Sequence, residues 1–142
     1  MASFVYRRHM TIEWGHCDPA GIVFNPRFFE FFDVSAWLLF EAALGVRRAE
    51  FNSTFGIVGP ALVDARAQFR KPAKFGDTIE IASRVTELRR SSFDLEHLIF
   101  LGGELAVEGG ETRAWAVKDG ADPLKIKALP IPPDVAARLK GG

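Results

Sequence analysis

Residues 25–45 decide the fold of this chain, and they read NPRFFEFFDVSAWLLFEAALG. Asn25 followed by Pro26 is a helix-start signal, because Asn accepts free backbone N–H groups as an N-cap and the fixed φ of Pro suits the first helical position. Gly45 suits the left-handed position that commonly ends a helix. The sequence therefore predicts one long helix from Pro26 to Leu44.

The predicted helix is apolar around most of its circumference. Its large apolar side chains are Phe28, Phe29, Phe31, Phe32, Trp37, Leu38, Leu39 and Phe40. Only a narrow polar stripe remains, formed by Arg27, Glu30, Asp33 and Glu41. A helix that is apolar nearly all round is buried. In a chain of this length, we expect a curved sheet to wrap around it.

The rest of the sequence supplies such a sheet. Alternating and β-rich segments predict five strands, at residues 4–14, 60–69, 78–88, 93–101 and 104–117. Short separators between the last four strands favour antiparallel hairpins. Beyond Asp119 the chain is rich in proline and reads as a docked tail with a short helical turn at 134–139. The order predicts one α+β domain over residues 1–142, with the helix on one face of an antiparallel sheet.

Composition narrows the class of protein. The 142 residues, 48% hydrophobic and 25% charged, suit one globular domain. A net charge of +0 argues against nucleic-acid binding, which needs a basic stripe. A single cysteine, no signal peptide and no apolar run long enough to span a bilayer lead us to expect a soluble cytoplasmic protein. The 13 Phe residues exceed what one small domain easily hides, which favours an oligomer.

Asp18 lies in a turn, Asp18-Pro19-Ala20-Gly21, between the first strand and the long helix. One interpretation is local, because an Asp carboxylate readily accepts hydrogen bonds from nearby backbone N–H groups. The other is chemical, because free N–H groups and the positive end of the helix dipole converge at the helix start. A thioester carbonyl placed there would be polarised, while a carboxylate attacks its carbon or activates a water. The sequence leaves both interpretations open.

The run from Ile12 to Pro26, IEWGHCDPAGIVFNP, resembles the signature of the 4-hydroxybenzoyl-CoA thioesterase family of the Pseudomonas type. Weaker similarity continues at residues 56–59, 89–93 and 112–115. The resemblance implies a hotdog fold, in which a sheet wraps a long central helix. It also implies hydrolysis of an acyl-CoA, with an aromatic or otherwise compact acyl group, to the free acid and CoA. Homodimers, commonly paired into tetramers, with active sites at the subunit interface are implied as well.

The resemblance assigns roles to individual residues. Asp18 matches the catalytic carboxylate, and Asn25 matches the residue whose backbone N–H polarises the carbonyl. Arg89, Arg90 and Ser91 match the turn that meets the CoA phosphates, and paired Arg beside hydroxyls also suits phosphate on chemical grounds. The family tends to have Lys where Ser91 stands, so one charge is missing here. Arg113 is open between pairing across strands and reaching the same phosphates.

The neighbours of Asp18 do not form a catalytic triad with it. Consecutive side chains of an extended segment point in different directions, so His16, Cys17 and Asp18 cannot converge. We expect Cys17 to be a small buried thiol and leave His16, where the family has an acidic residue, without a role. His9 and His97 lack the spacing of a metal motif. We therefore expect no metal, and no cofactor beyond the CoA of the substrate.

Two other functions stay open. A hotdog hydratase or dehydratase would act by proton transfer on the acyl chain, but no His stands where those enzymes' catalytic motif would require it. A non-catalytic acyl-CoA-binding subunit would bind CoA esters without releasing thiol.

Overall fold

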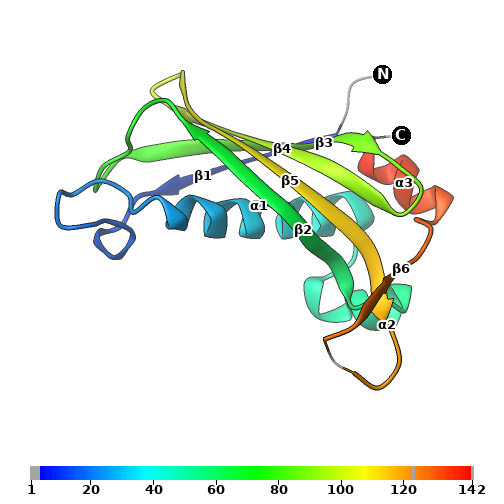
Figure 1. Ribbon diagram of the computed structural model, residues 1–142. Helices are drawn as coiled ribbons and strands as arrows, with labels where there is room; N and C mark the ends of the chain where they lie inside the picture. Colours follow the sequence, from blue (N-terminus) through cyan, green and yellow to red (C-terminus); the bar gives the residue numbers. More distant parts are fainter. Residues whose placement is uncertain (1–3, 123, 142) are drawn as a thin grey trace.

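The computed structural model describes residues 4–122 and 124–141. A six-stranded antiparallel sheet curves over the long helix α1 (Pro26–Leu44), as Figure 1 shows. Its strands are β1 (Val5–Thr11), β2 (Gly59–Phe69), β3 (Thr78–Leu88), β4 (Ser92–Leu101), β5 (Glu104–Lys118) and β6 (Ile126–Ala128). The order is β1-β3-β4-β5-β2, and β6 pairs with the end of β5. The predicted α+β class and antiparallel sheet are confirmed.

Helix α1 has the predicted bounds, but it begins in a different way from the one expected. Gly45 follows its last turn with φ 68°, the left-handed conformation predicted for it. The Asn25 side chain, however, makes no capping hydrogen bond, and its backbone is already helical (φ −46°, ψ −42°). A capping side chain reaches the first N–H groups from an extended backbone. The capping role expected for Asn25 is therefore wrong, and Pro26 starts the helix by its fixed φ.

The sheet covers only one side of α1. The buried residues of the helix are Phe28, Phe31, Phe32, Ser35, Ala36, Leu39, Phe40 and Leu44. Val34 is 40% exposed, and Trp37 and Leu38 are only partly buried. The expectation of a helix enclosed all round therefore needs correction: the sheet of one chain leaves an apolar stripe of α1 open.

Two neighbouring glycines in β5, Gly109 and Gly110, allow close packing on the two faces of the sheet. The Phe32 ring packs so tightly on Gly109 that a Cβ there would lie 2.5 Å from ring carbons. Phe32 also stacks on His97, with ring centroids 5.0 Å apart and planes at 7°. On the opposite face, a Cβ on Gly110 would meet the guanidinium of Arg66 at 2.9 Å. The first glycine fixes the spacing between helix and sheet, and the second leaves a hollow on the outer face.

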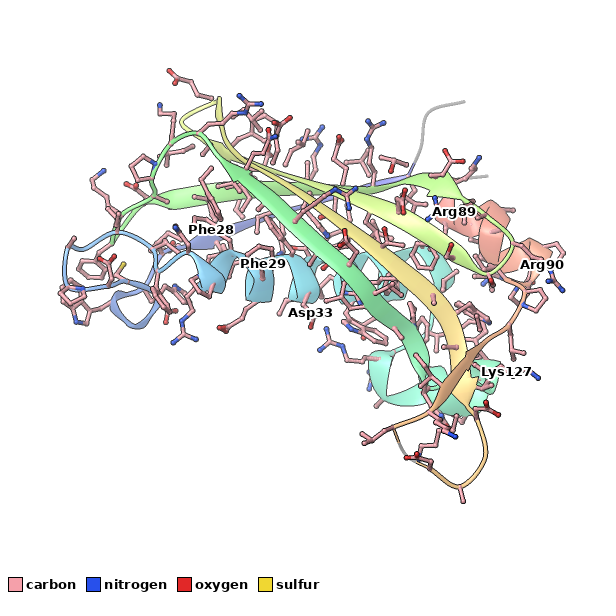
Figure 2. All side chains as sticks on the ribbon, viewed as in Figure 1. Phe28, Phe29, Asp33, Arg89, Arg90 and Lys127 are labelled. Carbon is pink, nitrogen blue, oxygen red and sulfur yellow. The ribbon has the colours of Figure 1, made fainter. Side chains whose placement is uncertain are left out.

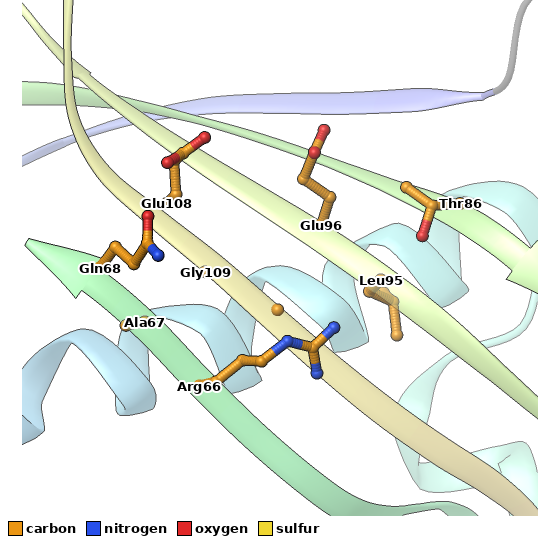
Figure 3. A pocket seen from close by; sticks show the side chains of 9 residues that line it. Arg66, Ala67, Gln68, Thr86, Leu95, Glu96, Glu108 and Gly109 are labelled. Carbon is orange, nitrogen blue, oxygen red and sulfur yellow. The ribbon is translucent and has the colours of Figure 1, made fainter.

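That hollow, shown in Figure 3, has a volume of about 530 Å³ and lies on the face of the sheet away from α1. Its charged groups are already paired with one another or with neighbours: Arg66 with Asp64, Glu96 with Arg84, and Glu108 with Arg70. Exposed pairs of this kind form a neutral surface and contribute little to stability. The hollow therefore presents no free charge that would single it out as the active site.

Besides α1 and the strands, the described residues form several short helical elements. They are the 3-10 helices η1 (Trp14–His16) and η2 (Arg48–Glu50) and the helices α2 (Phe51–Phe55) and α3 (Pro133–Leu139). Helix α3 confirms the helical turn predicted in the tail, and Arg138 donates from Nη1 to the carbonyl of Leu44 (3.0 Å) at the end of α1. Strand β6 and helix α2 were not predicted. Among the helices that the structure describes, none is long and apolar enough to cross a membrane.

Candidate active site

The loop that carries Asp18 is held in place by backbone hydrogen bonds. It begins after η1, and Asp18 N donates to Ile22 O (2.9 Å) while Gly21 N donates to Asp18 O (2.9 Å). Gly21 has φ 82°, which a residue with a side chain adopts only at a cost. Val23 N donates to Ala73 O (2.9 Å), so the loop is fastened to the segment between β2 and β3. Asp18 is thus presented by a defined turn.

The carboxylate of Asp18 uses one oxygen and leaves the other available. Its Oδ1 accepts a hydrogen bond from Ala20 N at 2.8 Å, which is the local turn interaction that the sequence left open. Within residues 4–122 and 124–141, its Oδ2 has no hydrogen-bond partner. The side chain is only partly buried. The local hydrogen bond expected for Asp18 is therefore present, and it orients the carboxylate while leaving Oδ2 available.

The start of α1 adds a free donor near this turn. Phe24 N donates to His16 O (2.9 Å), and Arg27 N donates to Phe24 O (2.8 Å). Asn25 N, between them, has no acceptor in the described part of the chain. It lies at the positive end of the dipole of a 19-residue helix, where negative charge on a ligand is stabilised.

A small apolar cavity lies beside Asn25, between α1 and the ends of β2 and the Asp18 loop. Its volume is about 180 Å³. Its apolar walls are Ile22, Val23, Phe28, Phe69 and Ala73, whereas Arg70 and Lys71 also line it and Asp18 does not. The rings of Phe28 and Phe69 lie 5.6 Å apart between centroids. The loop before α1 and the start of α1 thus supply a carboxylate, a free N–H and a largely apolar recess within one short segment of the chain.

The side chains of His16 and Cys17 contact Glu13 and Phe31 and form no hydrogen bond with Asp18 in the described part of the chain. His16 Nδ1 accepts a hydrogen bond from Glu13 N (2.9 Å), and its ring packs edge-on against Phe31 at 5.1 Å. The thiol of Cys17 lies 3.6 Å from Glu13 O. The three side chains therefore do not form the hydrogen bonds of a catalytic triad. No three His, Cys, Asp or Glu side chains among the described residues are grouped to hold a metal ion.

The arginine turn between β3 and β4 presents its two arginines differently. Arg89 binds both carboxylate oxygens of Asp94, from Nη1 at 3.1 Å and Nη2 at 2.6 Å, and Nε donates to Ser92 Oγ. This pair raises the pKa of Arg89 and lowers that of Asp94. Arg90 is exposed, its side chain has no partner among the residues described, and its carbonyl accepts from Ile131 N (2.8 Å). Figure 2 shows both arginines at one end of the molecule.

Arg113 lies elsewhere, and of the two roles that the sequence left open the structure supports pairing with other protein groups, not a contact with CoA phosphates. Its guanidinium faces α1 and is only 2% exposed. Arg113 donates to Glu111 from Nε (3.1 Å) and Nη2 (3.2 Å), to Asp33 Oδ1 (2.8 Å) and to Pro60 O (3.0 Å). A buried guanidinium with these acceptors is not available to a phosphate at the surface.

Arg113 belongs to a network of hydrogen-bonded polar side chains, whose members are Ser83, His97, Glu111, Arg113 and Asp33. His97 Nε2 lies 3.1 Å from Glu111 Oε1, and His97 Nδ1 lies 2.6 Å from Ser83 Oγ. Burial would raise the pKa of Glu111, but the hydrogen bonds from His97 and Arg113 outweigh it and hold that pKa below its ordinary value. The sequence did not predict this polar network. The available signal was spacing, because Glu111 and Arg113 share the inward phase of β5 with buried Trp115.

The Asp18 turn and the arginine turn lie at opposite ends of one chain, as Figure 1 shows. Helix α1 runs between them, and its 19 residues span about 28 Å. The sequence predicted both groups for one site, but a single subunit does not bring them together.

The sequence profile described as thioesterase-like superfamily matches residues 12–139. The chain is 33% identical over 129 residues to 4-hydroxybenzoyl-CoA thioesterase of Pseudomonas sp. strain CBS-3, covering 87% of this chain and 89% of that one. The structure of that enzyme superposes with a TM-score of 0.85 at 29% identity, covering 94% and 98% of the two chains. A gentisyl-coenzyme A thioesterase superposes with a TM-score of 0.78 at 30% identity, covering 94% and 98%.

These similarities extend over nearly the whole length of each partner and agree with the predicted hotdog architecture. The chain therefore belongs to the thioesterase-like superfamily, within the 4-hydroxybenzoyl-CoA thioesterase family that its Asp18 motif resembles.

Proposed function

We propose that this chain hydrolyses an acyl-CoA thioester to the free acid and CoA, with Asp18 as the reactive carboxylate. Two observations on the loop before α1 and the first turn of α1 carry the proposal. Asp18 has a fixed carboxylate with Oδ2 available, and Asn25 has an N–H without an acceptor in the described part of the chain. The activities named for the relatives in the same family support it.

The chemistry follows from the charge that develops on the thioester. The carbonyl oxygen accepts the Asn25 N–H and gains negative charge at the positive end of the helix dipole. Asp18 either attacks the carbonyl carbon, releasing CoA thiolate and leaving a mixed anhydride for water to hydrolyse, or removes a proton from an attacking water. Both routes leave the carbonyl-polarising role with Asn25.

A compact aromatic acyl group is the proposed substrate class. The cavity beside Asn25 holds about 180 Å³ and is lined largely by apolar side chains, including Phe28 and Phe69. An apolar cavity of roughly 150 Å³ accommodates benzene. The relatives act, by name, on 4-hydroxybenzoyl-CoA and gentisyl-CoA, which supports the same class here.

A homodimer would complete the site. Strand β2 is an edge strand, and its residues Leu62 and Val63 are 50% and 63% exposed. Exposed apolar edges are typical places for strands of a second copy to pair. Antiparallel pairing of two β2 strands about a twofold axis sets the Asp18 end of one subunit beside the arginine turn of the other.

In that arrangement the partner's arginine turn meets the CoA phosphates. We assign the leading role to Arg90, because Arg89 is held by Asp94. Ser91, the next residue after Arg90, belongs to the same proposed phosphate site. Pairing of dimers into tetramers, a cytoplasmic location and the lack of a cofactor other than the CoA of the substrate are proposed on the family resemblance and composition alone.

The alternatives receive less support from the geometry. A hydratase of the hotdog type would need a histidine at the substrate, but His97 is fully buried and His16 packs against Phe31. Hydration of an enoyl-CoA without thiol release would favour that function. Binding of CoA esters with no thiol release from any acyl group would favour a non-catalytic subunit.

The test is thiol release from a panel of CoA thioesters by the unmodified protein and by Asp18→Asn. We expect Asp18→Asn to lower kcat by roughly 10³-fold or more, since it removes the attacking or basic oxygen. Asp122→Asn is the matched control, because Asp122 Oδ1 accepts from Leu124 N at 2.9 Å as Asp18 Oδ1 accepts from Ala20 N. Equal rates for Asp18→Asn and Asp122→Asn would overturn the assignment.

A further inference from the structure

The side of α1 that faces β1 carries a second cavity, separate from the one beside Asn25. Its volume is about 450 Å³, and it lies between the edge strand β1, helix η1 and the open stripe of α1. Its lining includes Arg8, Met10, His16, Phe31 and Val34. A volume of this size accommodates a small organic molecule. Neither Asp18 nor Asn25 contributes to it.

Arg8 brings to this cavity a positive charge that forms no ion pair within the described residues. It points from β1 toward α1, where Nε donates to Ser35 Oγ (2.8 Å) and Nη2 donates to Phe31 O (3.0 Å). Both acceptors are neutral, and no carboxylate in the described part of the chain lies within ion-pair distance of it. Partial burial lowers the pKa of Arg8, as expected for a cation without a nearby counter-charge. An anion in the cavity would supply that charge.

His16 adds a second donor and the remaining walls are apolar. Because His16 Nδ1 accepts from Glu13 N, the proton of the neutral ring lies on Nε2, which has no acceptor among the residues that the structure describes. Met10, Phe31 and Val34 supply the apolar surface. Two carboxylates also line the cavity. Glu30 is paired with Arg27 (2.7 and 3.1 Å), whereas Glu13 is exposed to solvent and forms no ion pair with Arg8.

We infer that this cavity is a second ligand site, which binds an organic carboxylate with a compact apolar body through Arg8 and His16. The carboxylate takes the free donors, and the body packs on Met10, Phe31 and Val34. A free acid of this kind is also the class of product that thioester hydrolysis releases. The site itself does not depend on that activity.

Methyl NMR of Met10 tests the inference directly, because the chain has only two methionines, Met1 and Met10. Protein labelled with ¹³C-methyl methionine is titrated with benzoate and, in parallel, with uncharged benzamide. We expect a saturable shift of the Met10 methyl with benzoate, and binding at least about 10-fold weaker with benzamide, since charge-assisted hydrogen bonds are the stronger kind. No saturable shift, or equal affinity for the two compounds, would overturn the inference.

Three variants locate the binding. Val34→Glu places a tethered carboxylate at the cavity and should abolish the benzoate shift, whereas Ala42→Glu, an exposed α1 position outside the cavity, should leave it intact. Arg8→Gln keeps an N–H donor for α1 and should weaken benzoate by about 10-fold or more. If Arg8→Gln does not fold, Val34→Glu and benzamide still decide. An unchanged benzoate shift in Val34→Glu would refute the site.

Discussion

Charged groups have opposite surroundings in the Asp18 turn and in the polar network that links Ser83 to Asp33. Asp18 binds one backbone N–H and leaves Oδ2 free at a partly exposed position. Glu111 and Arg113 are buried, and their hydrogen bonds go to one another, to His97, to Asp33 and to a backbone carbonyl. A carboxylate that is to react must be available, whereas a buried charge is tolerated only when fully paired. In the proposed enzyme, the reactive carboxylate lies at one end of α1, and the paired charges that stabilise the fold lie beneath its middle.

The strongest test of this separation is Arg113→Met. Removing the guanidinium leaves Glu111 buried without its cationic partner, which costs about 3–5 kcal/mol for a broken buried pair. Urea unfolding should show this loss, while Asp18→Asn should change the free energy of unfolding by no more than about 0.5 kcal/mol. Similar losses in both variants would contradict the division of roles.

Lowering the pH should destabilise the folded protein through the protonation of Glu111 in the polar network. Its pKa in the folded protein is held below the ordinary value of 4.5, so the unfolded state takes up protons first as the pH falls. The stabilisation is present above pH 4.5 and is lost as the pH drops through the lower folded pKa. Unfolding free energies measured from pH 7 to pH 3 should therefore fall less steeply in Glu111→Gln. An equally steep fall would assign the acid sensitivity to other carboxylates.

Gly109→Ala tests the packing of α1 on the same part of the sheet. The new Cβ would lie 2.5 Å from the buried Phe32 ring, so helix and sheet must separate, at a cost of roughly 1–3 kcal/mol. Gly110→Ala is the matched control, because its Cβ meets the flexible end of Arg66, which can move aside. Thermal unfolding should rank Gly109→Ala clearly below Gly110→Ala, and the reverse order would contradict this account.

The smallest expected effect is that of Arg90→Ala at the far end of α1. Loss of one exposed phosphate contact should raise KM for the acyl-CoA about 10-fold, with kcat and the free energy of unfolding nearly unchanged. Shortening the substrate to a pantetheine thioester, which lacks the nucleotide phosphates, should remove the difference between Arg90→Ala and the unmodified protein. A difference that persists with the short substrate would place Arg90 outside the phosphate site.

Local patterns predicted the elements that local physics controls. The bounds of α1 followed from Pro26 and Gly45, and the strand segments followed from alternation and turn residues. The Asp18 motif predicted the family, which the comparisons confirm. The short elements α2 and β6 escaped because they have too few residues for a periodic pattern.

The sequence by itself determined the long apolar helix, the antiparallel sheet and the turn that carries Asp18, because each depends on neighbours along the chain. Only the tertiary structure decided that Arg113 is buried against Glu111 and Asp33, that Arg89 is taken by Asp94, and that the Asp18 and arginine turns lie at opposite ends of α1. These outcomes depend on contacts between residues far apart in sequence. No local pattern encodes which charged group finds a partner and which stays free.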